Sequence, residues 1–167
     1  MVAQQLKGEP RHRLRSGGLP LHAYDELIRY SSEYLDATNG SRAATDPAHR
    51  AAEIAYLVLR ISKGDVRLRL GTLARKLGIA SRALGAHFRE LYGTTLKDSQ
   101  IHLRIKWARH LMHIHPERKI TSIAAESGYS DVADFNHVFR KYTGMSPRQY
   151  RDDCRKAQES NGPDDSF

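Results

Sequence analysis

Two stretches of this chain carry the same pattern, LARKLGIASRALGAHFRELYG at residues 73–93 and IAAESGYSDVADFNHVFRKYTG at residues 123–144. In each stretch an alanine is followed four residues later by a glycine, and an apolar residue follows six or seven positions after that. The alanine lets two helices cross closely, the glycine ends the first helix in a left-handed conformation, and the apolar residue fixes the second helix on the first. Each stretch is therefore predicted to form a helix-turn-helix.

Helical periodicity continues on both sides of these stretches, and no segment is typical of a β-strand, so the fold is predicted to be all-α. Asp46-Pro47 and Ser146-Pro147 are helix-start signals, with an N-cap residue followed by proline in the first turn. The predicted helices cover residues 20–36, 47–62, 70–77, 81–92, 95–114, 120–127 and 131–142, with a short one opening at 146–147.

These helices divide the chain into two helix-turn-helix subdomains, the first unit at residues 46–93 and the second unit at residues 116–152, joined by a long connecting helix at 94–115. An accessory helix and a linker are expected over residues 19–45. The polar ends are expected to be disordered tails, a basic one at residues 1–18 and another at 153–167.

Charge is concentrated on the repeated region. Residues 51–152 hold eighteen Lys and Arg against nine Asp and Glu, a balance of +9 in a chain of net charge +8. Such an excess is typical of a domain that binds a polyanion. The connecting helix would be roughly 27–30 Å long, close to the ~34 Å turn of B-DNA. The sequence therefore predicts two recognition helices in adjacent major grooves of double-stranded DNA.

Composition excludes several other classes. No stretch approaches the ~18 uncharged apolar residues of a membrane span, and no apolar block follows the basic N-terminus as in a secretory signal. The single cysteine, Cys154, excludes an internal disulfide framework and fits a reducing compartment. We expect no membrane contact and a cytoplasmic, nucleoid-associated location in a bacterium.

The run Ile120–Arg151, ITSIAAESGYSDVADFNHVFRKYTGMSPRQYR, closely resembles the C-terminal signature of AraC/XylS-type transcription regulators. Arg104, Ile105, Ala108 and Leu111-Met112 resemble the connecting helix of that family. Leu73-Ala74 and the residues from Gly78 to Phe88-Arg89 resemble its first helix-turn-helix. The resemblance covers about residues 50–152.

The resemblance implies a sequence-specific regulator of transcription, an activator, with RNA polymerase as a further partner. Family members usually carry an N-terminal ligand-binding barrel, whereas about 50 residues without a strand pattern precede the domain here, so a stand-alone DNA-binding domain or a remnant is expected. The chain departs from the family at Ala80, usually a serine cap, and at Gly85-Ala86, where a basic or amide residue is usual. Ser99 and Gln100 replace an aromatic and an aliphatic residue.

Five residues are predicted to contact bases. Asn136 can pair bidentately with adenine, Arg82 with guanine, and Val132 or Ala133 can touch a thymine methyl. His137 stands where many relatives have arginine, and we expect it to donate to a base edge or a phosphate. For each, an ordinary surface residue remains the alternative, and Arg82 is nearly as well explained by a position near phosphate.

Six residues are predicted to contact phosphates, and they are Ser81, Arg89, Arg104, Ser130, Arg140 and Lys141. For Arg104 a structural ion pair with Asp98 or Glu90 is an equal alternative.

No catalytic motif is present, so the chain is predicted not to be an enzyme and to need no cofactor. His110, His113 and His115 lack the spacing of a metal site, and no metal is expected. The alternative function is an interaction module that does not contact bases. It would modulate a full-length regulator of the same family, and residues 20–36 would mediate dimerisation.

Overall fold

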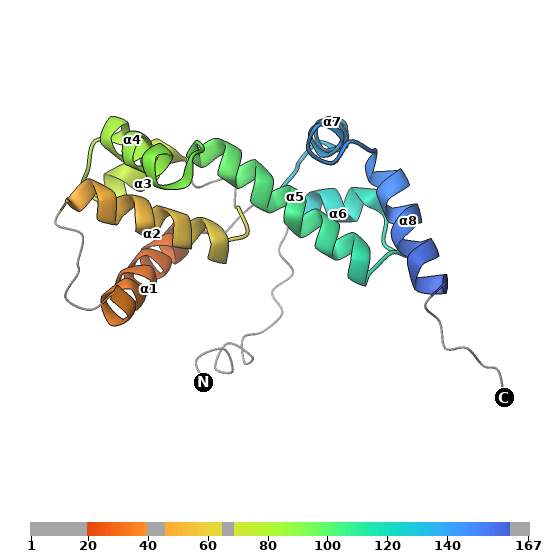
Figure 1. The fold of residues 1–167 in the computed structure, drawn as a ribbon, viewed down its shortest axis with the longest axis horizontal. Helices are drawn as coiled ribbons and strands as arrows, with labels where there is room; N and C mark the ends of the chain where they lie inside the picture. The colour runs from red at the N-terminus through yellow and green to blue at the C-terminus, as the bar shows by residue number, and fades with distance from the viewer. Residues whose placement is uncertain (1–19, 40–45, 65–68, 161–167) are drawn as a thin grey trace.

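The computed structural model describes residues 20–39, 46–64 and 69–160, and within them every regular element is an α-helix, which confirms the all-α prediction. Figure 1 shows α1 to α4 at one end, α5 running across the centre, and α6 to α8 at the other end. The helices are α1 (Leu21–Asn39), α2 (Pro47–Ile61), α3 (Leu70–Lys76), α4 (Ser81–Tyr92), α5 (Leu96–Ile114), α6 (Ile120–Glu126), α7 (Val132–Thr143) and α8 (Pro147–Ser160).

Two hydrophobic cores lie at the two ends of α5. The first core is formed by α1 to α4 and the start of α5, and its fully buried side chains include Tyr24, Leu59 and Phe88. The second core is formed by the rest of α5 and by α6 and α7, around Met112 and Phe139. Each helix-turn-helix therefore has its own apolar centre, and α5 contributes to both.

Helix starts follow the capping residues in the sequence. The carboxylate of Asp46 accepts from the backbone N–H of Ala48 at 2.8 Å, as expected for the N-cap of α2. At α8, Ser146 Oγ accepts from the N–H of Gln149 at 3.3 Å, and Gln149 Oε1 accepts from the N–H of Ser146 at 2.9 Å. This reciprocal pair is a capping box, which fixes the start of α8.

The helix α8 differs from the prediction in length. It continues to Ser160, so the expectation of a disordered tail is wrong for residues 153–160. The helix contacts α5 along its length: near its start the Tyr150 hydroxyl accepts from Arg109 Nε at 3.1 Å, and in the extended part Gln158 donates to the carbonyl of His113. The predicted tail at 1–18 and residues 161–167 lie outside the described residues.

The accessory helix α1 is longer than predicted, reaching Asn39, and it is part of the first core. Tyr24 and Leu35 are buried against that core. Near its start, Asp25 accepts from Lys76 of α3, and near its end Asp36 accepts from Arg50 of α2. The apolar face of α1 is therefore used within the chain.

Candidate nucleic-acid interface

The helix α7 is fixed to the second core by one face, which leaves the other face on the surface. Phe135 and Phe139 are 0% exposed, and their ring centroids lie 5.5 Å apart. The carboxylate of Asp131 accepts from the N–H of Ala133 at 2.7 Å, which caps the start of the helix. A capped helix on two buried rings presents its outer side chains in a defined orientation.

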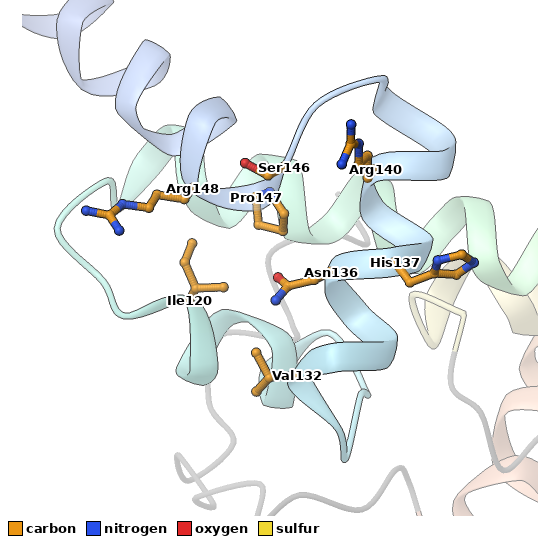
Figure 2. A pocket seen from close by; sticks show the side chains of 8 residues that line it. All are labelled: Ile120, Val132, Asn136, His137, Arg140, Ser146, Pro147 and Arg148. Carbon is orange, nitrogen blue, oxygen red and sulfur yellow. The ribbon is translucent and has the colours of Figure 1, made fainter.

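The outer face of α7 carries four of the residues predicted to contact bases. Ala133, Asn136 and His137 are exposed, and Val132 is half-buried. A hollow of about 500 Å³ lies beside α7, and Asn136 and His137 are both among the residues that line it. Figure 2 shows the Asn136 side chain pointing into this hollow. Both residues therefore border the same hollow on the outer face of α7.

The hollow is bounded by three elements. Ile120 at the start of α6 and Pro147 at the start of α8 form apolar walls, and Arg140 and Arg148 stand at its rim (Figure 2). Sequence reasoning missed Arg148. The sequence feature that could have identified Arg148 is the helix start at Ser146-Pro147, because a helix that begins there places the next residue beside α7.

The exposed polar residues around α7 include the phosphate candidates of the second unit. Ser130, Arg140 and Lys141 are all exposed. Ser130 lies just before the helix and the two cations lie in its last half, so they flank Asn136 on both sides along the chain. That distribution suits contacts with a polyanionic backbone on either side of a base contact.

In the first unit, α4 is anchored in the same way but begins differently. Leu84 and Phe88 are 0% exposed, while Ser81, Arg82 and Arg89 are exposed. The N-cap residue is Ala80, which provides no side-chain hydrogen bond, and Ser81 is the first helical residue. The first recognition helix therefore begins without the cap that Asp131 gives to α7.

Two neighbours of Leu84 have structural explanations. A Cβ on Gly85 would lie 3.4 Å from the Leu70 side chain, so this position faces α3 and not the outer surface. His87 Nε2 lies 3.1 Å from the carboxylate of Asp46, which connects α4 to the start of α2. Sequence reasoning missed that contact because it joins distant parts of the chain.

The two recognition helices lie on the same side of the molecule. In Figure 1 both α4 and α7 are at the upper edge, at opposite ends of α5. With 19 residues, α5 is about 28 Å long.

Arg104 does not belong with the surface cations. It is only 9% exposed, its Nε donates to the carbonyl of Ser127 at 2.9 Å, and another of its nitrogens donates to the carbonyl of Gly128. Its guanidinium also lies 3.6 Å from the ring centroid of Tyr129. The expectation that Arg104 contacts phosphate is therefore wrong, because its charged group faces the turn between α6 and α7.

Two other classes of site are absent from the described residues. Among residues 20–39, 46–64 and 69–160, no group of three or more His, Cys, Asp or Glu is arranged to hold a metal ion. None of the described helices is both long enough and apolar enough to span a membrane.

Residues 73–153 match the model of a family described as a helix-turn-helix domain. Over 70 residues the chain is 40% identical to the HTH-type transcriptional activator RhaR of Klebsiella pneumoniae. That match covers 42% of this chain but only 25% of RhaR, so the chain spans about a quarter of its curated relative.

Solved structures share the fold. The C-terminal domain of the two-component response regulator yesN from Fusobacterium nucleatum is 31% identical, with a TM-score of 0.55, over 60% of this chain and 97% of that domain. The DNA-binding domain of AdpA, a global transcriptional factor solved in complex with a target DNA, is 24% identical. It aligns with a TM-score of 0.55 over 71% of this chain and 100% of that domain.

Proposed function

Since residues 73–153 belong to the AraC/XylS-type family of helix-turn-helix transcription regulators, we propose that the chain binds a specific DNA sequence by placing α4 and α7 in two adjacent major grooves. The observation that carries this proposal is the exposure of both recognition helices on one side of α5, each anchored by buried rings or leucines on its other face. The length of α5, about 28 Å, is close to the ~34 Å repeat of B-DNA.

In this arrangement the second unit supplies most of the base contacts. Asn136 presents its carboxamide to an adenine edge, Val132 or Ala133 contacts a thymine methyl, and His137 donates to a base edge or a phosphate. The hollow beside Asn136 leaves room for the nucleic acid to approach the helix closely.

The first unit contributes fewer base contacts. Arg82 in the first turn of α4 is the residue proposed to contact guanine, and the next turn offers only Ala86. The phosphate contacts are proposed for Ser81, Arg89, Ser130, Arg140 and Lys141, all of them exposed. The DNA-binding domain of AdpA, which shares this fold, was solved in complex with a target DNA, and this supports DNA as the partner of the fold.

Activation of transcription is proposed from the name of the relative RhaR, an HTH-type transcriptional activator. RNA polymerase as the second partner and the bacterial cytoplasm as the location are proposed as what an activator of this family requires. Since the chain covers a quarter of that relative, the proposal concerns the DNA-binding part.

The test begins with selection of bound duplexes from a random pool by the full chain. A two-part motif with centres about one helical turn apart is the expected result. A selected motif with only one part would mean that α4 does not contribute to base recognition. Failure to select any sequence, together with association with a full-length relative, would favour the alternative of an interaction module.

Asn136→Ala then tests the base contact on the selected site. It should weaken binding by ~1–3 kcal/mol and relax the preference at one base position, because one bidentate pair is lost. Arg140→Ala is the matched comparison from the same helix. It should weaken binding equally on all sequences and reduce the dependence on salt by about one ion. Equal weakening on every sequence by Asn136→Ala would contradict its role.

A further inference from the structure

Arg104 lies on α5 between residues of the first unit and residues of the second unit. Its guanidinium contacts the turn between α6 and α7, through the carbonyls of Ser127 and Gly128 and the ring of Tyr129. The stem of its side chain lies against the turn that follows α2, because a Cβ built on Gly64 would be 3.1 Å from Arg104 Cγ. One residue of the connecting helix therefore touches both units.

The contact with the first unit is through Gly64. This glycine is buried, and a Cβ placed on it would lie 2.5 Å from the carbonyl oxygen of Gln100 and 3.1 Å from both Cβ of Leu103 and Cγ of Arg104. The backbone after α2 therefore rests directly on α5 and on the stem of Arg104. There is no space for a side chain between them.

The contact with the second unit is equally close. A Cβ on Gly128 would lie 3.2 Å from Arg104 Nε and 3.5 Å from one of its terminal nitrogens. Both Gly64 and Gly128 have positive φ, at +77° and +84°. Arg104 is thus enclosed between two left-handed turns, one from each unit, and we call Gly64, Arg104 and residues 127–129 the inter-unit bridge.

A second contact, close to Arg104, also joins the end of the first unit to α5. Lys63 Nζ lies 3.3 Å from the ring centroid of Trp107, one turn of α5 beyond Arg104. Burial lowers the pKa of Lys63, and the negative charge of Glu126 on α6 acts against that lowering. Lys63 of the first unit is therefore within electrostatic reach of the second unit.

From this geometry we infer that Arg104 is a positioning residue that fixes the orientation of α4 relative to α7. The inference rests on the proposed function, because a two-part DNA site requires the two recognition helices to be held at one spacing. A guanidinium suits the task, since its several donors in one plane bond two consecutive carbonyls while its face stacks on a ring. Lysine retains the charge without that planar fork.

A test without DNA measures the spacing directly. Spin labels on Ala86→Cys in α4 and Lys141→Cys in α7, both at exposed positions and in a Cys154→Ser background, report the distance between the recognition helices. The parent protein should give one narrow distance distribution, and Arg104→Lys and Arg104→Met should broaden or shift it. Lys106→Met, an exposed cation on the same helix, is the control and should leave it unchanged.

A second measurement uses the DNA selected by the parent protein. Duplexes with both parts of the motif, with one part, and with one or two base pairs inserted between the parts are compared. The Arg104 variants should bind single parts as the parent does. Their affinity for the joined site should fall at least ~10-fold, because the gain from linking two contacts depends on geometry. Insertion of one or two base pairs between the parts should weaken the binding of the Arg104 variants less than it weakens the binding of the parent protein.

The outcomes separate the two ideas. A narrow, unchanged distance distribution in both Arg104 variants would refute the inference that Arg104 fixes the orientation of α4 relative to α7, whatever the DNA result. Loss of helical circular dichroism in both would also overturn it, because Arg104 would then hold the fold and not the orientation. Failure of the parent protein to select a two-part motif would count against the proposed function, while the spin-label distances would still decide the role of Arg104.

Discussion

Replacement of Gly64 by alanine isolates the energy of the close approach between α2 and α5. Two effects act at this position. The φ of +77° costs an L-residue about 1–2 kcal/mol. The new Cβ would also lie 2.5 Å from the Gln100 carbonyl oxygen, which belongs to a helix backbone and cannot rotate away. Overpacking of this kind costs about 1–3 kcal/mol.

Gly93 provides the matched control, because it has nearly the same backbone conformation without the close contact. Its φ is +66°, it ends α4 in the same unit, and nothing lies within 4 Å of a Cβ placed on it. Gly93→Ala should therefore cost only the conformational part, about 1–2 kcal/mol. The difference of about 1–3 kcal/mol between the two variants measures the contact of Gly64 with α5.

The assay is urea denaturation followed by circular dichroism. With a slope of about 2 kcal/mol per molar urea, Gly64→Ala should unfold at a midpoint about 0.5–1.5 M below that of Gly93→Ala. The slope should be the same for both, since neither change alters the surface exposed on unfolding. Coincident midpoints, or a lower midpoint for Gly93→Ala, would refute the reasoning that the turn after α2 is pressed against α5.

Two further predictions concern a helix cap and a titration. Asp131→Ala should lower the stability by about 0.5–2 kcal/mol because the N–H of Ala133 loses its acceptor, whereas Ala80→Ser should raise it by up to a similar amount; thermal denaturation that showed the same sign for both would contradict this. Burial raises the pKa of Tyr92 from 10.0 to about 12, with the carboxylate of Glu53 adding to the shift. The unfolded chain therefore releases this proton first, so the stabilisation is complete below pH 10 and is lost as the pH rises through about 12. In an ultraviolet titration Tyr92→Phe should remove the last tyrosinate to form, and loss of an early one would disprove the assignment.

Local signals in the sequence were sufficient for most helix bounds. Ser81–Tyr92 was predicted to the residue, and Asp46, Thr95 and Asp131 all mark the residue before a helix. Capping, proline placement and the period of apolar residues act within a few positions along the chain, so one sequence is enough to locate them. The length of α8 was missed because its extension depends on contacts with α5, far away in the sequence.

The same distinction between local signals and distant contacts applies to the site residues. Exposure of Asn136, His137 and Arg140 was predictable, since the period of a helix sends them away from Phe135 and Phe139. The position of Arg104 was not, because an arginine on a half-exposed helix can face either solvent or a neighbouring turn. Arg148 was missed for a related reason: its place beside α7 depends on how α8 packs.

The sequence by itself determined that the chain is helical, that it contains two helix-turn-helix units, and which side chains the second recognition helix exposes. Those features follow from periodicity and caps, which are properties of neighbouring residues. Only the tertiary structure decided that α1 belongs to the first core and that Arg104 lies enclosed between Gly64 and Gly128. Both depend on packing between segments distant in the chain, where shape and available space, rather than residue type, select the partner.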